Sequence, residues 1–269
     1  MVTSYHVHSR FSDGRGELIQ YIQAANKFGL DELGFSDHYV LTPDGSELNW
    51  SMALDGMDAY VHAVQSVAKE AEKDLVVRLG IEVDYFPETA DNLAILLKKY
   101  PFDYVIGSVH FLDGFVIDGY AEIWKKLTQL ERNDTIRRYW NRLREMAESG
   151  LFDIAGHLDL SKKFGHRPSV NISNEISETL DAIANADMAV EINTAGWYAP
   201  CAEEYPEPSI IRGCFQRGIP VLVTADAHEP MNLRQSFDRA YNLLADIGYT
   251  EIASYAGRKR KMQPLALGK

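Results

Sequence analysis

Cysteine is almost absent from this sequence: Cys201 and Cys214 are the only two among 269 residues, and they do not form a CxxC pair. The chain also begins without a leader in which charged, apolar and small residues follow one another. A secreted fold held together by disulfides is therefore unsupported. We expect the protein to be cytoplasmic.

Long apolar runs and an excess of positive charge are missing as well. No apolar stretch approaches the ~20 residues that a membrane-spanning helix requires, so no membrane association is expected. The formal net charge of -12 and the pI of about 5.1 argue against a broad basic surface for nucleic acid. The basic run from Arg258 to Lys261 is expected to be a solvated terminal turn or strand edge. A cationic small substrate or bound metal ions suit the acidic chain better.

The sequence does contain a regular alternation of short apolar runs with longer segments of helical period. This pattern is typical of repeated βα units around a parallel sheet. The expected strands are residues 5–8, 32–35, 76–83, 104–109, 154–158, 189–193 and 220–224. The expected helices are residues 17–27, 57–73, 90–99, 120–148, 174–186, 209–217 and 233–245. No linker or change of composition divides the chain, so we expect one domain, residues 1–269, of the α/β class.

Histidine and acidic side chains recur where the expected strands end. His6 and His8 are two residues apart, so on an extended chain both imidazoles point to one face. The other side chains at strand ends are Asp37, His38, Glu82, His110, His157, Asp159, Asp226 and His228. In a parallel barrel the C-terminal strand ends meet at one mouth, where active sites form. We therefore expect these side chains to lie together, and only His62 and His166 of the histidines to lie elsewhere.

A buried cluster of imidazoles and carboxylates is electrostatically unfavourable unless positive charge lies among them. Metal ions supply that charge. Imidazole and carboxylate ligands suit zinc, iron or manganese, and the cluster offers more ligands than a single catalytic zinc requires. The sequence therefore predicts more than one metal ion. Paired metals can hold a hydroxide nucleophile and stabilise charge on phosphoryl oxygens, which favours a phosphoesterase.

The motifs around these residues resemble those of the PHP (polymerase and histidinol phosphatase) family. In chain order they are His6-Val7-His8-Ser9, Ser36-Asp37-His38, Gly80-Ile81-Glu82, Gly107-Ser108-Val109-His110, Gly156-His157-Leu158-Asp159 and Asp226-Ala227-His228. Residues 101–110, 157–160 and 191–196 are more similar still to the monofunctional histidinol-phosphate phosphatases of that family. The resemblance covers nearly the whole chain. It implies a distorted (β/α)7 TIM-like barrel of PHP type.

The resemblance also implies a site of three metal ions. The first ion would be held by His6, His8, Glu82 and Asp226. Glu82 would bridge to a second ion held by His110 and His157, and the third would be held by Asp13, His38 and His228. Asp13 could instead cap the helix that begins near Gly16. Asp37 and Asp159 are expected to orient imidazoles without binding metal themselves.

The reaction implied is in-line attack by a metal-bridging hydroxide on a small phosphomonoester, with phosphate expected as bound product. Lys162 and Lys163, just beyond Asp159, are candidates for binding the phosphate; the alternative is a solvated pair of lysines. The proton for the leaving alkoxide could come from a metal-bound water, Asp159 or His228, and the sequence does not choose among them.

The chain departs from the resemblance at one position. Many relatives of this subfamily place an arginine after the segment that ends at Gly196, whereas this chain has Trp197-Tyr198. Arg167 or Lys163 would then contact the phosphate, or Trp197 would stack on a flat ring such as imidazole; Trp197 as core packing is the alternative. The longest irregular stretch, residues 39–54, carries Trp50. It is either a lid over the barrel mouth or a surface loop above a buried Trp50.

The expected activity is hydrolysis of L-histidinol phosphate to L-histidinol and phosphate, a step of histidine biosynthesis. One alternative keeps the fold and the metals but changes the substrate to another small phosphate ester. A second is an amidohydrolase, since those barrels also begin with an HxH motif and end with a metal-binding aspartate. A third is a non-catalytic metal-binding module. The sequence leaves the oligomeric state open.

Overall fold

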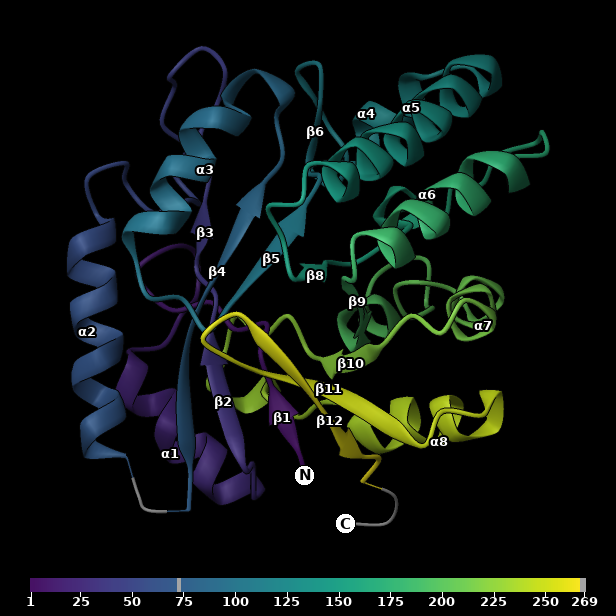
Figure 1. The fold of residues 1–269 in the computed structure, drawn as a ribbon. Helices are drawn as coiled ribbons and strands as arrows, with labels where there is room; N and C mark the ends of the chain where they lie inside the picture. The colour runs from purple at the N-terminus through teal and green to yellow at the C-terminus, as the bar shows by residue number, and fades with distance from the viewer. Residues whose placement is uncertain (72–73, 267–269) are drawn as a thin grey trace.

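Seven parallel strands form the wall of a nearly closed barrel in the computed structural model, which describes residues 1–71 and 74–266 (Figure 1). In sheet order the strands are β1 (Thr3–Ser4), β2 (Glu32–Phe35), β4 (Val76–Asp84), β5 (Tyr104–Ser108), β8 (Ile154–Ala155), β9 (Ala189–Asn193) and β10 (Val221–Thr224). The short strand β3 (His38–Tyr39) also pairs with β4. All these pairs are parallel, so the predicted α/β barrel is confirmed.

The barrel closes between its first and last strands through a single parallel bridge, Val7 to Ala227. The His8 N–H donates to the Ala227 carbonyl and the Ala227 N–H donates to the His6 carbonyl, both at 3.0 Å. The sequence predicts a strand over residues 5–8, but β1 lies before it, and His6 and His8 occupy the segment that makes the bridge. Their rings still share one face, with centroids 5.0 Å apart.

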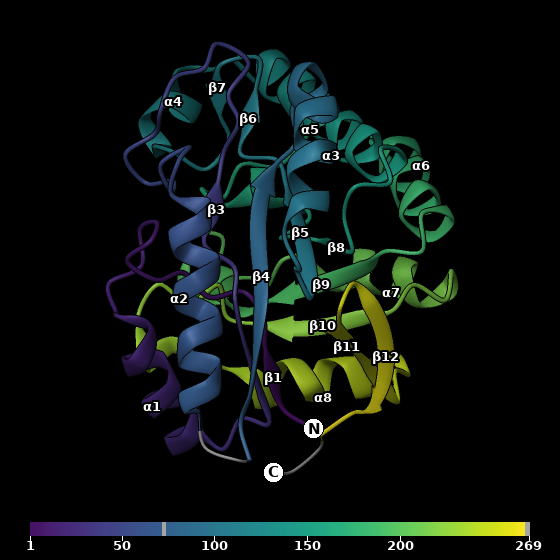
Figure 2. The same ribbon diagram turned by 60° about the vertical axis from the view of Figure 1, so that its left-hand side comes forward.

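Helices cover the outside of the barrel (Figure 2). They are α1 (Leu18–Phe28), α2 (Met57–Glu70), α3 (Ala90–Lys99), α4 (Ala121–Lys126), α5 (Gln129–Glu148), α6 (Ser173–Asn185), α7 (Pro208–Gln216) and α8 (Phe237–Ile247). Short 3-10 turns span Pro87–Thr89, Leu160–Lys162, Thr194–Tyr198 and Pro230–Asn232. Among the described residues, no helix combines the length and the apolar character needed to span a membrane.

Helix boundaries differ from the sequence prediction where local capping intervenes. The single helix predicted over residues 120–148 is two helices, because Thr128 caps α5. The Thr128 hydroxyl accepts from the Glu131 N–H, and the Glu131 carboxylate accepts from the Thr128 N–H at 2.7 Å, which is a capping box. The last predicted helix begins later than expected, at Phe237, after a 3-10 turn and a left-handed Ser236. The predicted end of the second helix, residues 72–73, lies outside the described residues.

Within the part of the chain that the structure describes, two antiparallel hairpins that the sequence does not predict accompany the barrel. The first, β6 (Phe111–Leu112) and β7 (Phe115–Val116), follows β5 directly. The second, β11 (Glu251–Ala256) and β12 (Lys259–Pro264), lies beside the N-terminal end of the barrel (Figure 1). There the Tyr255 N–H donates to the Tyr5 hydroxyl at 3.3 Å and the Tyr255 hydroxyl donates to the Asp153 carbonyl at 3.0 Å. The predicted basic run of residues 258–261 is confirmed as a turn and strand edge.

Inside the barrel, aromatic rings fill the N-terminal half. Tyr5 and Tyr104 stack with ring centroids 4.9 Å apart, and both are fully buried. The Tyr104 ring lies against two strand positions that have no side chain. A Cβ added at Gly34 or at Gly80 would lie 2.2 Å from a Tyr104 ring or hydroxyl atom. These two glycines make room for the ring, which forms the floor beneath the polar half of the barrel.

Candidate metal centre

The C-terminal strand ends bring together all nine side chains that the sequence predicts as metal ligands. They are His6, His8, Asp13, His38, Glu82, His110, His157, Asp226 and His228. Among the described residues, their donor atoms form four overlapping groups within 4.8 Å, and every group of this kind lies here. The groups are His6, His8 and Asp226; His6, Glu82 and His157; His38, Glu82 and His110; and His8, Asp13, His38 and His228. His62, by contrast, is exposed on α2, as predicted.

Glu82 lies at the centre of the cluster. Its Oε2 atom is 2.7 Å from His38 Nδ1 and 3.1 Å from His6 Nε2, and its Oε1 atom is 3.0 Å from His157 Nε2. His110 Nε2 is more distant, at 3.9 Å from Oε1. Strand β4 positions this carboxylate, because Glu82 pairs in register with His38 of β3 and points into the barrel. The geometry is that of a carboxylate shared between ligand groups.

Asp226 and Asp13 bring carboxylates to the two outer groups. Asp226 Oδ1 is 3.1 Å from His8 Nε2, and Asp226 has a left-handed backbone with φ of 50° just after β10. Asp13 Oδ1 is 3.2 Å from His228 Nε2 and 3.8 Å from His38 Nε2. This pairing rules out the alternative in which Asp13 caps the first helix, since the N-cap of α1 is Glu17.

A tight turn carries Asp13 back toward the strand ends. The Gly14 N–H donates to the Ser9 carbonyl at 2.9 Å. A Cβ at Gly14 would lie 1.9 Å from the His8 carbonyl oxygen, so this close approach requires glycine.

The carboxylates of the cluster are held ionised. Burial by itself would raise the pKa of Glu82, but His38 and His6 beside it hold that pKa well below its usual range. Burial likewise opposes the ionisation of Asp13, yet its hydrogen bond with His228 lowers the pKa of Asp13 to about 2. For His228, the same pairing overcomes burial and raises the pKa to about 9. Ionised carboxylates that lie this close together in the protein interior require compensating positive charge.

Buried donor atoms without hydrogen bonds show that metal ions fit this cluster. His6 Nε2, His38 Nδ1 and Glu82 Oε2 are fully buried and make no hydrogen bond, although the two nitrogens lie 3.1 and 2.7 Å from Glu82 Oε2. Unpaired polar atoms in a protein interior are costly. Cations bound at these donors would satisfy the three atoms, and imidazole with carboxylate is a donor set that zinc accepts.

Two acidic residues that the sequence reasoning missed orient the histidines. Glu191 Oε1 accepts from His6 Nδ1 at 2.5 Å, and its Oε2 accepts from the His157 N–H at 2.6 Å. Asp84 Oδ2 lies 3.0 Å from His110 Nδ1, and its Oδ1 accepts from the His110 N–H at 2.8 Å. Fixing Nδ1 in this way leaves Nε2 of each ring free for a metal. Strand alternation could have revealed Asp84, which follows Glu82 by two residues on the same face.

The orienting role predicted for Asp37 and Asp159 is wrong, since neither carboxylate contacts an imidazole. Asp37 accepts from the Ser9 N–H at 2.7 Å and from the Ser12 hydroxyl at 2.7 Å, so it holds the loop after His8. Asp159 has a left-handed backbone with φ of 59°, which turns its carboxylate toward Lys162 Nζ at 2.9 Å. Burial raises the pKa of Asp159 to about 7.

A cavity of about 610 Å³ opens above the cluster. Trp50, Asp118 and Lys163 line it together with six of the predicted ligands: Asp13, His38, His110, His157, Asp226 and His228. The Lys163 ammonium lies 3.1 Å from Asp118 Oδ2 in its wall. Among the described residues that line the cavity, Lys163 is the only lysine or arginine. It is therefore the one predicted phosphate-binding side chain that the fold brings to the cavity.

The other three predicted phosphate- or substrate-binding residues lie outside this wall. Lys162 is buried with its ammonium 2.6 Å from the Glu204 carbonyl and 2.9 Å from Asp159. Arg167 pairs with Glu203 and Glu207 on the surface. Trp197 packs partly buried, its Nε1–H donating to Glu204 Oε2 at 2.7 Å. Each of these side chains is held by a partner of its own, which explains why none reaches the cavity.

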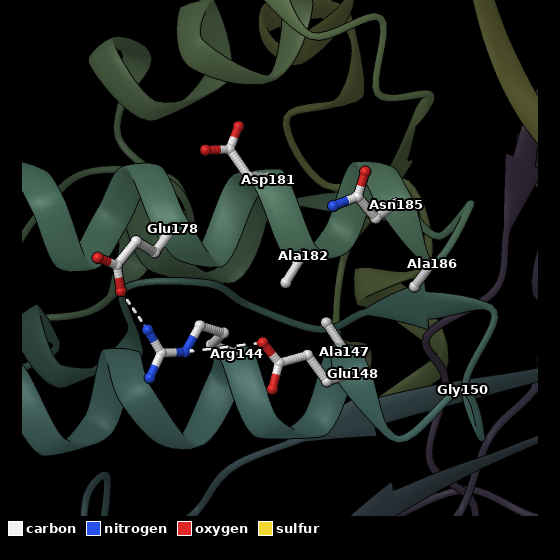
Figure 3. Close-up of a pocket in the computed structure, with 9 residues that line it drawn as sticks. All are labelled: Arg144, Ala147, Glu148, Gly150, Glu178, Asp181, Ala182, Asn185 and Ala186. Atoms are coloured by element: carbon white, nitrogen blue, oxygen red, sulfur yellow. Dashed lines mark hydrogen bonds and ion pairs between the residues drawn. The ribbon is translucent and has the colours of Figure 1, made fainter.

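A separate groove of about 490 Å³ lies between α5 and α6 (Figure 3). Arg144 on one side of it forms ion pairs with Glu178 across the groove and with Glu148 on its own helix. None of the nine predicted metal ligands lines this groove. The chemistry therefore belongs to the cavity at the strand ends.

We expect Glu191→Gln to weaken the metal centre without unfolding the barrel. The amide would place an N–H group against donors that now share the carboxylate, so the His6 ring would lose its fixed orientation and the backbone N–H of His157 would lose its acceptor. A loss of about 10- to 100-fold in metal affinity or turnover is expected. Metal content after dialysis and kcat measure it, with Glu178→Gln on the exposed face of α6 as the matched control. Equal metal retention in both variants would contradict the orienting role.

Comparison with known proteins shows the same fold and related sequences. The PHP domain family model matches residues 4–195. A probable histidinol-phosphatase of Deinococcus radiodurans is 36% identical over 260 residues, which cover 96% of this chain and 97% of that protein. The histidinol-phosphatase of Bacillus subtilis is 28% identical over 256 residues, covering 87% and 96% of the two chains.

Among solved structures, the chain resembles the histidinol phosphate phosphatase of Lactococcus lactis, crystallised in complex with zinc, L-histidinol and phosphate. The TM-score is 0.83 with 22% sequence identity, and the match covers 97% of this chain and 98% of the other. The distorted (β/α)7 barrel predicted from the sequence is confirmed by this match.

Proposed function

The chain belongs to the PHP domain family, and from that premise we propose that it hydrolyses L-histidinol phosphate to L-histidinol and phosphate, a step of histidine biosynthesis. The observation that carries the proposal is the convergence of nine imidazole and carboxylate side chains beneath a cavity whose wall contains Lys163. Relatives named as histidinol-phosphatases, matched over nearly their whole length, support the choice of substrate.

We assign three metal ions to the cluster. His6, His8, Glu82 and Asp226 would hold the first; Glu82, His110 and His157 the second; and Asp13, His38 and His228 the third. Glu82 would bridge the first two ions, which is supported by its two oxygens facing different histidines. Zinc is supported by the ion in the Lactococcus lactis structure, and the same donors also suit iron or manganese.

Metal ions at these donors would generate a hydroxide from water and offset the negative charge of the phosphoryl oxygens. The chain's own contribution is to place the phosphate and to move a proton. Lys163 faces the cavity and would contact the phosphate, once its ammonium exchanges Asp118 for the substrate anion. Of the two side chains considered as proton donors, Asp159 is occupied by Lys162 outside the cavity, and His228, which lines the cavity, is assigned to the third ion.

The proposed function is tested by metal analysis combined with phosphate release. Wild type and His228→Ala would be compared with L-histidinol phosphate, a panel of sugar phosphates and nucleotides as substrates. About three metals per chain, a clear preference for histidinol phosphate and loss of most turnover in His228→Ala would support it. Equal turnover of the whole panel would indicate another phosphate ester as substrate, and no hydrolysis with any metal would indicate a binding module.

Lys163→Gln is expected to weaken substrate binding more than the chemical step. The variant removes the cation that lines the cavity, so KM for the phosphate ester should rise and kcat/KM should fall about 10- to 100-fold. Steady-state kinetics measure this effect. Arg167→Gln is the matched control, because its guanidinium pairs with Glu203 and Glu207 away from the cavity. A larger loss in the Arg167 variant would show that the phosphate lies elsewhere.

The three metals are expected to leave in two stages when a chelator is added. The side chains of Asp13 and His228 are 33% and 37% exposed, whereas those of His6 and Glu82 are 0% and 1% exposed. The ion between Asp13, His38 and His228 should therefore exchange first. Metal content at successive times of chelation, measured by mass spectrometry, would show a fast loss of about one ion per chain.

The control for this experiment is Asp13→Asn, which removes the exposed carboxylate. It should bind about one ion fewer and show only the slow stage of metal loss. Loss of all ions in a single stage from both proteins would contradict the difference between the sites.

A further inference from the structure

Trp50 forms part of the wall of the cavity that the predicted metal ligands line. Its ring lies edge-on to His38, with centroids 4.9 Å apart and planes at 82°, and edge-on to His110, at 5.9 Å and 76°. Phe111 stacks on the indole with planes 10° apart and centroids 5.9 Å apart. Phe111 therefore covers one face of the indole, the two imidazoles contact the ring, and another part of the Trp50 side chain lines the cavity.

The backbone on the C-terminal side of Trp50 is pinned to strand β3. The Met52 N–H donates to the His38 carbonyl at 2.9 Å, and the Ser51 hydroxyl accepts from the Val40 N–H at 3.1 Å. Trp50 is thus held next to a predicted metal ligand by backbone hydrogen bonds as well as by ring contacts. Trp50 is partly buried and lines the cavity, so it is not the tryptophan covered by a surface loop; a lid over residues 39–54 stays a prediction.

The position of the indole determines which part of a bound substrate it can contact. His38 and His110 belong to two different proposed metal groups, and Trp50 contacts both rings. The organic part of a phosphate ester bound at those groups therefore starts close to the indole. Aromatic side chains bind flat rings by offset stacking, and tryptophan offers the largest surface for it.

The residue for which the sequence suggested this role is not available for it. Trp197 donates to Glu204, and the Arg239 guanidinium lies 4.1 Å from its ring centre. Trp197 is also absent from the cavity wall.

We propose that Trp50 is a specificity-determining residue that stacks on the planar ring of the leaving group. The inference rests on the proposed function and narrows it: the preferred substrates are phosphate esters of short alcohols that carry a flat heteroaromatic ring. A sugar phosphate has no planar ring to place against the indole. Discrimination by Trp50 therefore acts on the leaving group and is separate from recognition of the phosphate.

The test compares two substrates that differ only by the ring, with the metal-loaded enzyme. They are L-histidinol phosphate and 2-aminopropyl phosphate, the same amino alcohol without imidazole. In the wild type, kcat/KM should favour histidinol phosphate. Trp50→Leu should lower the ratio of the two kcat/KM values about tenfold, mainly through KM, and Trp50→Phe should restore part of it. Metal content should remain that of the wild type in both variants.

A structural role gives a different pattern. If Trp50 only braced His38 and His110, both substrates would lose kcat/KM equally or metal content would fall, and either result would overturn the proposal. Fluorescence gives a second measurement: L-histidinol should quench the emission of the wild type and have little effect on Trp50→Phe, because Trp124 and Trp140 are fully buried and the partly buried Trp197 does not line the cavity. Equal quenching in the two proteins would also overturn it.

The outcome remains interpretable if the proposed substrate is wrong. If the wild type hydrolyses phosphomonoesters but not histidinol phosphate, the proposed function is wrong. The role of Trp50 is then tested by the ratio of the kcat/KM values for phenethyl phosphate and ethyl phosphate. A ratio that Trp50→Leu lowers would support the role, and an unchanged ratio would overturn it. Absence of all phosphatase activity would overturn both.

Discussion

Glu82→Gln should abolish metal-dependent turnover almost completely. Glu82 is 1% exposed and its two oxygens face His6, His38 and His157 at 2.7 to 3.1 Å. The amide keeps the size of the side chain but loses the negative charge and turns one acceptor into a donor. Mutation of a residue that only orients a metal ligand already lowers metal affinity or activity about 10- to 100-fold. Removal of the shared ligand itself should therefore lower kcat more than about 100-fold.

Metal content gives the independent readout for this variant. Two of the three proposed ions share Glu82, so the purified variant should retain about one ion per chain. Glu88→Gln, at an exposed position shortly after the same strand, is the control that should keep both metals and turnover. Full metal content and wild-type kcat in Glu82→Gln would refute the bridging assignment.

Gly80→Ala should destabilise the barrel more than the addition of a methyl group usually does. The new Cβ would lie 2.2 Å from a carbon of the Tyr104 ring, which is fully buried and donates its hydroxyl to the Tyr5 carbonyl. The ring cannot move away without losing that hydrogen bond. Overpacking of this kind costs about 3 kcal/mol of unfolding free energy, measurable as a lower denaturant midpoint.

A double-mutant cycle separates this clash from an effect of the strand backbone. In a Tyr104→Leu background the smaller side chain leaves room for the methyl group, so Gly80→Ala should cost less there than in the wild type. The same cost in both backgrounds would show that the conformation of β4, and not the ring, requires glycine.

Parallel topology explains why so much of the site was predictable. In a barrel, residues at the ends of successive strands converge whatever their distance along the chain. His6, Glu82 and Asp226 could therefore be placed together from strand positions alone, and the fold does place them together. The expectation of one domain over residues 1–269 stays a prediction. Local patterns of strands and helices do not report the number of domains.

Side chains beyond the strand ends were not predictable, because short turns decide their direction. Lys162 and Lys163 are neighbours, but the first ends a 3-10 turn of Leu160–Lys162. Successive side chains in such a turn point about 120° apart. Lys162 consequently faces Asp159 in the interior and Lys163 faces the cavity. No periodicity in the sequence could have distinguished the two.

Residues missed by the sequence reasoning share a different cause. Glu191 is a carboxylate in the middle of a buried strand, a position that patterns assign to apolar side chains. It is stable there because His6, His157 and Thr224 donate hydrogen bonds to it. Its role depends on partners from three other strand ends, so only the assembled barrel reveals it.

The single bridge that closes the barrel has a consequence for how the protein acquires its metals. His8 and Asp226, 218 residues apart in the chain, are ligands of the same proposed ion. Contacts between such distant segments form late in folding, after the cost of closing a long loop has been met. All ligands of the first ion are therefore present only after the ribosome has synthesised residue 226. Metal binding would then stabilise the contact between the first and last strands of the sheet only after the barrel has closed.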